Sequence, residues 1–190
     1  VHLVDLDTEA GQRAGLPAVR VEPERAEEVV ALLNRTHAGK HLFAPYSEER
    51  LGARLGRTPE YGWQNWWGIE GKAGGLMAVA GLLDMGRWWR LTRRVKASGE
   101  ETTSSAATVL DFGYAEGGQQ QMVDLLHHLL GVAASWGRDH LSICLDPEES
   151  LYPLLPAAAR VGVNFRFFAS GIAVPSAQEI GRFYLDPAYL

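Results

Sequence analysis

The residues best suited to bind a charged ligand follow a strand-like run in the second half of the chain. Residues 107–114 read ATVLDFGY, and Glu116-Gly117-Gly118 separates them from a strongly amphipathic segment that begins at Gln119. Glycines let a ligand approach the backbone closely, and the free N–H groups and dipole at the start of a helix attract phosphate. The sequence therefore predicts a phosphate-binding turn between a strand and a helix.

The other reactive side chains do not form a convincing constellation. His37 and His41 have i, i+4 spacing, but a glycine lies between them and no acidic partner is near. His127 and His128 are adjacent on an expected helix and point about 100° apart. Cys144 lies in an apolar run, as expected for an inert core thiol. We expect no metal site.

The elements that position these residues can be predicted from apolar periodicity and turn residues. Ser47 can cap a helix and Pro23 can start one. The expected strands are 18–22, 61–70, 76–83, 86–96, 107–114, 140–145 and 164–174. The expected helices are 24–39, one that begins at Ser47 and has Leu51 and Leu55 on one face, 119–136 and an irregular 146–160. Together these elements predict an α/β (α+β) domain whose mixed, mostly antiparallel central sheet is flanked by helices.

Domain boundaries are expected near the two ends of the chain. Residues 1–16 contain the isolated strand-like run HLVDL and a polar, glycine-containing stretch. We interpret them as a lead-in or linker, or as the tail of a preceding domain. Residues 17–175 form the expected domain, and 176–190 form a C-terminal tail. The chain begins at Val1, so it is either processed or a piece of something longer.

The segment LDFGYAEGGQQQMVDLL, residues 110–126, resembles the GNAT family of acyl-CoA N-acetyltransferases. The family has a strand of alternating apolar residues, a glycine-rich loop whose N–H groups bind the pyrophosphate of coenzyme A, and a helix with a leucine pair. The matching positions are Leu110, Phe112, Tyr114, Gly118 and Leu125-Leu126. The expected element order matches the family over about residues 18–174, which implies a GNAT-like fold.

The resemblance implies acetyl-CoA, or another acyl-CoA, as cofactor. It places Phe112, Tyr114, Gly117, Gly118, Gln119 and Gln120 at the cofactor. Three loop positions depart from the family pattern: Gly117 replaces an Arg or Gln, and Gln120 and Met122 replace small residues. We expect the Met122 side chain to lie on the approach route of the pyrophosphate, so the loop is degenerate.

A GNAT reaction needs a base for the amine and an acid for the departing thiolate. In the family the acid is often a tyrosine early in the helix after the fifth strand, which implies Tyr152. If Gly162 is aligned to the family's glycine at the end of that helix, the position falls near Ala158 instead, and Tyr152 is then a packing residue. Glu70 and Asp111 are the candidate bases; the alternative is that each is solvated or paired.

The acceptor side is expected in the loop HAGKHLFAPY, where GNAT proteins form one wall of the acceptor groove. His37, Phe43 and Tyr46, together with Trp67, are the candidate substrate-binding residues; a simple helix connection is the alternative for the loop. Tryptophans at neighbouring strand positions, such as Trp66 and Trp67, face opposite sides of a sheet. We therefore interpret the aromatic set as partly core and partly contact surface; its members are Tyr61, Trp63, Trp66, Trp67, Trp88 and Trp89.

Composition excludes several functional classes. With 46% apolar residues the chain can bury a core, and its net charge of −5 is unsuited to general nucleic-acid binding. No apolar run approaches the ~20 residues of a membrane span, and a single cysteine fits a reducing compartment, so we expect a cytoplasmic protein. One basic cluster, Arg87, Arg90, Arg93, Arg94 and Lys96, is either a solvated hairpin edge or a site for a 3′-phosphate or an acidic partner.

Two functions of different classes follow. The first is an N-acetyltransferase domain that transfers an acetyl or other acyl group from acyl-CoA to an unidentified small-molecule or protein amine. The second is a catalytically degenerate GNAT-like domain with a structural or recognition role in a tandem protein or homodimer. The altered loop favours the second function, and the intact strand-loop-helix favours the first.

Overall fold

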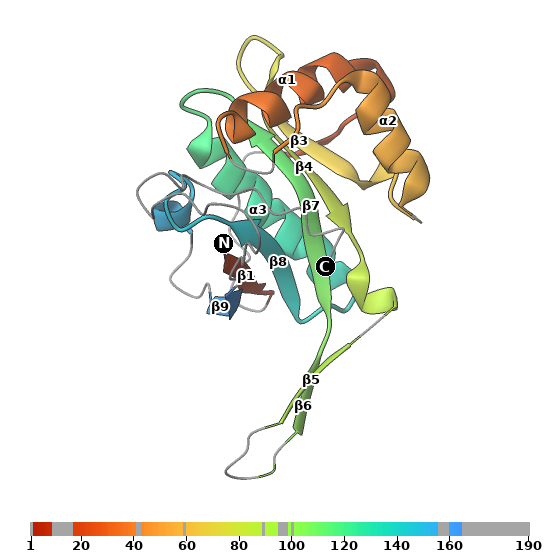
Figure 1. Ribbon diagram of the computed structural model, residues 1–190, viewed down its shortest axis with the longest axis vertical. Coiled ribbons are helices and arrows are strands. Elements are labelled where there is room, and N and C mark those ends of the chain that lie inside the picture. Colours follow the sequence, from red (N-terminus) through yellow and green to blue (C-terminus); the bar gives the residue numbers. More distant parts are fainter. Residues whose placement is uncertain are drawn as a thin grey trace, which may run out of the picture.

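A computed structural model describes residues 2–8, 17–40, 43–58, 60–88, 90–94, 99, 101–155 and 160–164 (Figure 1). Its strands are β1 (His2–Asp7), β2 (Val19–Arg20), β3 (Trp66–Glu70), β4 (Leu76–Leu83), β5 (Leu91–Arg94), β6 (Glu101–Ser104), β7 (Ala106–Tyr114), β8 (His140–Leu145) and β9 (Arg160–Asn164). Its helices are α1 (Ala26–His37), α2 (Glu48–Arg57) and α3 (Gln119–Ser135), with 3₁₀ turns η1 (Pro23–Arg25), η2 (Trp63–Asn65), η3 (Met85–Arg87) and η4 (Tyr152–Leu154).

Seven of the described strands form one sheet in the order β2-β3-β4-β7-β8-β1-β9. Within it, β7 and β8 run parallel, and the other described neighbours run antiparallel. The parallel pair requires a crossover, which α3 supplies. This arrangement confirms the mixed, mostly antiparallel sheet flanked by helices that the sequence predicts.

The helices cover both faces of the sheet (Figure 1). On α3, Met122, Leu125 and Leu129 recur at helical spacing and pack with Ala80 and Val109 on one face. The apolar residues of α1 and α2 pack on the other face. There α1 comes so close to β7 that a Cβ at Gly113 would lie 2.6 Å from the α1 backbone. No helix among the described residues is long and apolar enough to cross a bilayer.

The N-terminal strand corrects the expected domain boundary. β1 lies between β8 and β9, with His2 opposite both Leu145 and Asn164, and its Val4 is only 2% exposed. Residues 2–7 are therefore part of the sheet and not a lead-in. The local alternation predicts a strand here, but its partners lie far along the chain, where periodicity cannot indicate them. The expected boundary at residue 175 and the tail 176–190 lie outside the described residues.

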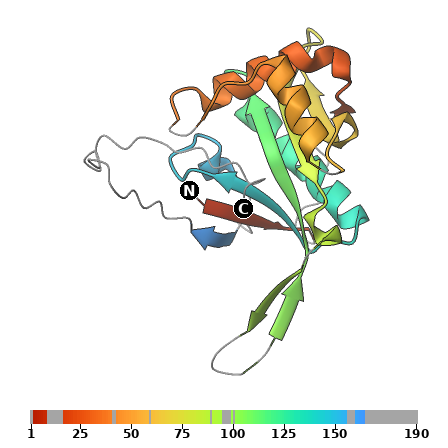
Figure 2. The same cartoon turned by 45° about the vertical axis from the view of Figure 1, so that its right-hand side comes forward.

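Three other expected elements differ in the structure. The expected strand 86–96 and the loop after it form a separate two-stranded hairpin, β5–β6, which projects from the body (Figure 2). The expected strand 61–70 begins only at Trp66, because η2 occupies its first part. In residues 146–155, the described start of the expected helix 146–160, the helical turn is η4, whose second residue is Pro153; proline removes a backbone donor and disfavours a longer helix. Arg160 belongs to β9. Residues 165–174 of the last expected strand lie outside the described residues.

Candidate functional site

The parallel strands β7 and β8 diverge part-way along their length. They are paired from Ala106 opposite His140 to Val109 opposite Ile143, whereas β7 continues to Tyr114. A register shift between β7 and β4 begins at the same place, because Gly81 pairs with Asp111 and Leu82 pairs with Val109. The extra residue, Leu110, forms a β-bulge, and a bulge bends a strand and increases its twist. The backbones of β7 and β8 therefore separate beyond Val109 (Figure 2), and we call the interval between the two strands the opening.

Two side chains of α1 bind the β7 backbone along this opening. The Tyr114 N–H donates to Thr36 Oγ1 at 2.8 Å, and the Thr36 hydroxyl lies 3.2 Å from the Tyr114 carbonyl oxygen. His37 Nε2 lies 2.9 Å from the Phe112 carbonyl oxygen. In an antiparallel strand the N–H and C=O of one residue point the same way. The Phe112 N–H therefore points toward the β8 side, into the opening.

A buried cluster of charged and polar groups spans the opening. The Lys40 ammonium forms an ion pair with Glu149 Oε1, and the two side chains are 3% and 4% exposed. Lys40 Nζ also lies 2.9 Å from His37 Nδ1. Burial, and next the Lys40 charge, lower the pKa of His37 to about 3. His37 is therefore neutral at pH 7.

The predicted phosphate-binding loop between β7 and α3 turns at Gly117 and Gly118. Gly117 has φ +72°, and a Cβ built there would have nothing within 4 Å. A Cβ at Gly118 would lie 2.7 Å from the Met77 carbonyl oxygen, so glycine is needed there for close packing. α3 follows with no side-chain cap and no acidic residue in its first turn. The first N–H groups of α3 thus lack capping side chains, a property of anion sites.

Met122 does not lie where the sequence predicts. Its side chain is 0% exposed and belongs to the core between α3 and the sheet. The interpretation of Met122 as an obstacle at the loop is therefore wrong, because the residue faces inward on the helix. Gln120 is exposed and its amide donates to Asp124 at 3.1 Å, whereas the Gln119 amide lies 3.4 Å from Ser150 Oγ.

The candidate base Asp111 is held in a buried network. Its Oδ1 accepts a hydrogen bond from the Tyr46 hydroxyl at 2.8 Å. Its Oδ2 accepts from the Tyr61 hydroxyl at 2.8 Å and from Arg54 Nε at 2.9 Å. Burial, and then the Asp111 charge, raise the pKa of Tyr61 well above its ordinary value. A carboxylate with these three donors is suited to anchoring α2 to the sheet and poorly suited to proton transfer.

The other two candidate catalytic residues lie apart from each other. Glu70 ends β3, which β4 separates from β7, and its carboxylate pairs with Arg25. Tyr152 lies in η4, and its hydroxyl is 3.0 Å from His2 Nδ1 on β1. Glu70 is therefore remote from the opening. Tyr152 packs at the edge of the core under α3, and its role as the acid stays a prediction.

Three of the four predicted acceptor residues lie together. The His37 ring centroid is 5.3 Å from that of Phe43, and Phe43 is 6.2 Å from Tyr46. Trp67 lies on the opposite face of the sheet, where Arg20 stacks 3.8 Å from its ring centroid. Its neighbour Trp66 faces the α1–α2 side, as strand alternation predicts. His41 and Trp89 lie outside the described residues.

Sequence reasoning missed Thr36, Lys40 and Glu149. Threonine in a helix, and lysine and glutamate in polar loops, ordinarily indicate solvent-facing positions. Nothing in the local sequence marks Lys40 and Glu149 as buried partners, because the contact joins the end of α1 to the loop after β8. Only the three-dimensional arrangement reveals them.

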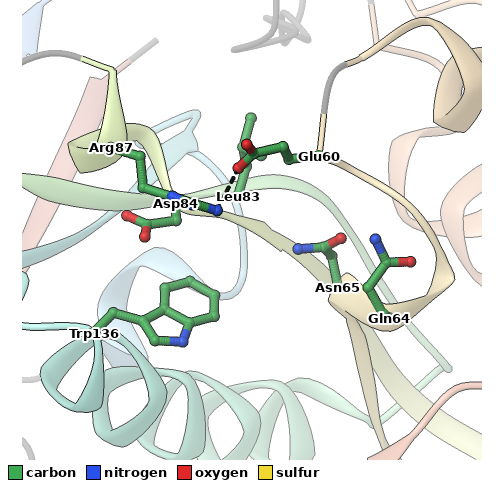
Figure 3. Close-up of a pocket in the computed structure, with 7 residues that line it drawn as sticks. All are labelled: Glu60, Gln64, Asn65, Leu83, Asp84, Arg87 and Trp136. Carbon is green, nitrogen blue, oxygen red and sulfur yellow. Dashed lines mark hydrogen bonds and ion pairs between the residues drawn. The ribbon is translucent and has the colours of Figure 1, made fainter.

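A second hollow lies at the other end of the sheet (Figure 3). It has a volume of about 560 Å³ and is lined by Glu60, Gln64, Asn65, Leu83, Asp84, Arg87 and Trp136. Arg87 pairs with Glu60 at 2.6 Å, and Asp84 pairs with Arg138 at 2.6 Å. Its charged side chains are thus already neutralised. Of the predicted basic cluster, Arg87 lies here, and the side chains of Arg93, Arg94 and Lys96 lie outside the described residues.

Comparison with known proteins gives matches to solved structures only. No protein-family model matches the chain. No curated protein matches it. N-myristoyltransferase of Saccharomyces cerevisiae with bound myristoyl-CoA is 10% identical with a TM-score of 0.45, over 70% of this chain and 32% of that one. The chain thus spans about a third of that protein's length.

Two shorter solved structures are similar over nearly their whole length. An aminoglycoside antibiotic 6'-N-acetyltransferase of Acinetobacter baumannii is 11% identical, with a TM-score of 0.48, over 82% of this chain and 99% of that one. The protein TTHA1254 of Thermus thermophilus is 16% identical, with a TM-score of 0.44, over 84% and 99%. Because these TM-scores are below 0.5, the fold assignment rests on strand order, the α3 crossover and the β7–β8 divergence. These features define a GNAT-like fold.

Proposed function

We propose that the chain binds an acyl-CoA and transfers its acyl group to an amine. The observation that carries the proposal is the divergence of β7 and β8 at Val109, which directs the Phe112 N–H into the opening. Beyond Val109, β7 continues to Tyr114, and Gly117 and the start of α3, which has no side-chain cap, follow in the chain. An extended ligand with an anionic end fits this order, because the Phe112 N–H can donate a hydrogen bond to its arm and the turn at Gly117 can bind its anionic end.

The residues present fit the parts of such a cofactor. The N–H groups of Gln119 and Gln120, with the open backbone at Gly117, would hold the diphosphate. The Phe112 N–H would bind a polar group of the extended arm. When bound, the cofactor supplies a thioester carbonyl activated toward amines. The protein's task is to align that carbonyl with the acceptor and to exclude water.

Tyr152 remains the candidate acid for the departing thiolate. Its hydroxyl contacts His2 Nδ1 at 3.0 Å, which holds the phenol in one orientation. It lies at the end of the sheet where β7 and β8 separate, because η4 follows the loop after β8. Phenol is a weak enough acid to be protonated at pH 7 and can give a proton to a thiolate.

One observation favours the alternative, a domain with a structural or recognition role. The Lys40–Glu149 ion pair already spans the opening, and both predicted carboxylate bases, Asp111 and Glu70, are paired. A ligand arm would have to coexist with this ion pair. The alternative predicts that acyl-CoA does not bind.

Titration calorimetry with acetyl-CoA separates these functions. We expect micromolar binding by the wild type. A Gln120→Glu substitution adds a negative charge near the start of α3. The charge interacts favourably with the helix dipole, so the helix stays stable, but it repels a diphosphate. We expect about tenfold weaker binding, ~1.4 kcal/mol. Gln64→Glu, an equal charge change at an exposed residue remote from α3's start, should bind as the wild type does.

The contrary outcomes are equally definite. If both variants bind acetyl-CoA as tightly as the wild type does, the diphosphate does not bind at the start of α3. No heat near ~1 mM acetyl-CoA, which corresponds to roughly −4 kcal/mol or weaker, would overturn the transferase proposal in favour of the structural one.

A further inference from the structure

A carboxylate oxygen in the opening has no hydrogen-bond partner among the described residues. Glu149 is 4% exposed, and its Oε1 pairs with Lys40, but its Oε2 is buried and unpartnered. A buried acceptor without a donor is costly, so it normally has a bound donor such as a water or a ligand. Glu149 is therefore a group prepared to accept one more hydrogen bond.

A chain of contacts links Glu149 to the β7 backbone next to the opening. Lys40 joins Glu149 to His37, and His37 in turn contacts the Phe112 carbonyl. The next residue, Ser150, has its hydroxyl 3.3 Å from the Tyr114 hydroxyl. Both contacts connect the loop after β8 to the part of β7 beyond Val109, which does not pair with β8. The carboxylate thus lies on the loop that reaches residues 112–114 of β7 through these contacts.

We propose that Glu149 binds the acceptor amine and removes its proton, an inference that rests on the proposed acyl transfer. The acceptor class is a primary alkylamine, which arrives as an ammonium ion and donates one N–H to Oε2. The Lys40 side chain is itself an alkylammonium, and its contact with Oε1 shows that this carboxylate accommodates the group in a buried setting. The Lys40 charge also favours the ionised form of the carboxylate.

The proton and bond balance of the step is simple. The Glu149 carboxylate takes one proton from the ammonium, which leaves a neutral amine. The amine nitrogen attacks the thioester carbonyl carbon; the C–N bond forms and the C–S bond breaks. The second proton on nitrogen goes to the departing sulfur, with Tyr152 as the candidate relay. The products are an amide and a thiol, and Glu149 then releases its proton to solvent.

The first test measures amine binding without the cofactor. n-Butylammonium chloride should raise the thermal unfolding midpoint of the wild type, because a ligand that binds only the folded state stabilises it. Tetramethylammonium chloride, which has the charge but no N–H donor, should not. Glu148→Gln, an exposed neighbour, should respond as the wild type does, and Glu149→Gln should not respond.

Glu149→Gln leaves a buried ammonium without its counter-ion and can fail to fold for that reason. The double variant Lys40→Met/Glu149→Gln removes both charges and keeps the experiment decisive. It should be folded and unresponsive to n-butylammonium. A butylammonium response that persists in either Glu149 variant, or its absence in the wild type, would overturn the assignment of Glu149.

The second test measures thiol release from acetyl-CoA with n-butylamine as acceptor. We expect both Glu149 variants to lose about 100-fold or more in rate at pH 7, as for removal of a general base, and to regain part of it as rising pH converts the ammonium ion to the free amine. The Kd of both variants for acetyl-CoA should stay within about twofold of the wild-type value. Glu148→Gln should match the wild type in Kd, rate and pH profile. Variants with unchanged rate and pH profile would refute the inference alone. Absence of acetyl-CoA binding in a wild type that still binds butylammonium would refute the transferase proposal, and the catalytic role with it, and leave only the amine site.

Discussion

His37 Nε2 lies 2.9 Å from the Phe112 carbonyl oxygen, and this contact determines the protonation of the buried cluster. A carbonyl oxygen only accepts hydrogen bonds, so Nε2 carries the proton and donates. Nδ1 of the neutral ring is then the acceptor for the Lys40 ammonium at 2.9 Å. Burial, and next the repulsion between a second ring proton and the Lys40 ammonium, explain the lowered pKa of His37.

This arrangement predicts a loss of stability in mild acid. The pKa of His37 is about 3 in the folded protein and about 6.5 in the unfolded chain, so the unfolded state binds more protons between these values. Stability is complete above pH 6.5 and falls as the pH falls toward 3. At a limiting slope of ~1.4 kcal/mol per pH unit, we expect a loss of roughly 1–2 kcal/mol between pH 6.5 and 5. Urea unfolding at a series of pH values measures it.

The matching control is His37→Gln, which keeps an N–H donor for Phe112 and has no titration in this range. Its unfolding free energy should change less over the same pH interval. His128 also has a lowered pKa, caused by burial and then by Arg20, so it adds to the loss with the same sign. His128→Gln should retain most of the pH dependence. Equal slopes for wild type and His37→Gln would contradict the neutral, buried His37.

The Asp111 network predicts a large stability effect. Asp111→Asn removes the counter-ion of Arg54 in a position that is 1% exposed. Breaking a buried ion pair from one side costs about 3–5 kcal/mol. Tyr46→Phe and Tyr61→Phe each remove one hydrogen bond to the same carboxylate and should cost about 1–3 kcal/mol, since a buried oxygen loses a donor. Denaturant midpoints test the series, and a loss below ~1 kcal/mol for Asp111→Asn would show that the network is not an anchor.

Local sequence signals predict α1, α2 and α3, because apolar periodicity and capping act within a few residues, whereas the expected helix 146–160 contains only η4 in its described part, residues 146–155. α3 was expected over 119–136 and ends at Ser135, because its apolar residues recur at helical spacing. α2 begins after Ser47, whose hydroxyl accepts from the Arg50 N–H at 3.1 Å as an N-cap. The proximity of His37, Phe43 and Tyr46 follows from the sequence, because these residues lie near one another in the chain as well as in space.

Features that depend on distant partners could not be predicted. The bulge at Leu110 arises from the register between β4 and β7, and no residue pattern within β7 marks it. The Lys40–Glu149 pair joins two polar loops, each of which alone resembles solvent-facing sequence. The burial of Met122 depends on the rotation of α3 against the sheet, which the alignment to a loop motif did not include. Contacts in space, not local composition, decide these positions.

Glycines near α3 predict a graded set of substitutions. Gly118→Ala would place a methyl group 2.7 Å from the Met77 carbonyl oxygen and 2.9 Å from that of Ala115, so backbone must move. Gly117→Ala meets no atom but adopts a left-handed φ, which costs about 1–2 kcal/mol. Gly131→Ala, inside α3 with open space, should stabilise by about 0.5–1 kcal/mol. The free energy of unfolding should be highest for Gly131→Ala, followed by the wild type, Gly117→Ala and Gly118→Ala. A different order would contradict the described backbone of this loop.

A double-mutant cycle on Lys40 and Glu149 tests whether the ion pair is a structural closure of the opening. Lys40→Met and Glu149→Gln each leave one buried charged group without its partner, and each should cost about 3–5 kcal/mol of unfolding free energy. The double variant has no such charge, so its loss should be well below the sum of the single losses, with a coupling of roughly 1–3 kcal/mol. Additive losses would contradict a direct interaction.

Because the pair joins the loop after α1 to the loop after β8, coupling would also mean that a ligand entering the opening must keep this contact or replace its energy. n-Butylammonium should then stabilise Lys40→Met more than wild type, since both carboxylate oxygens of Glu149 become available to the added amine.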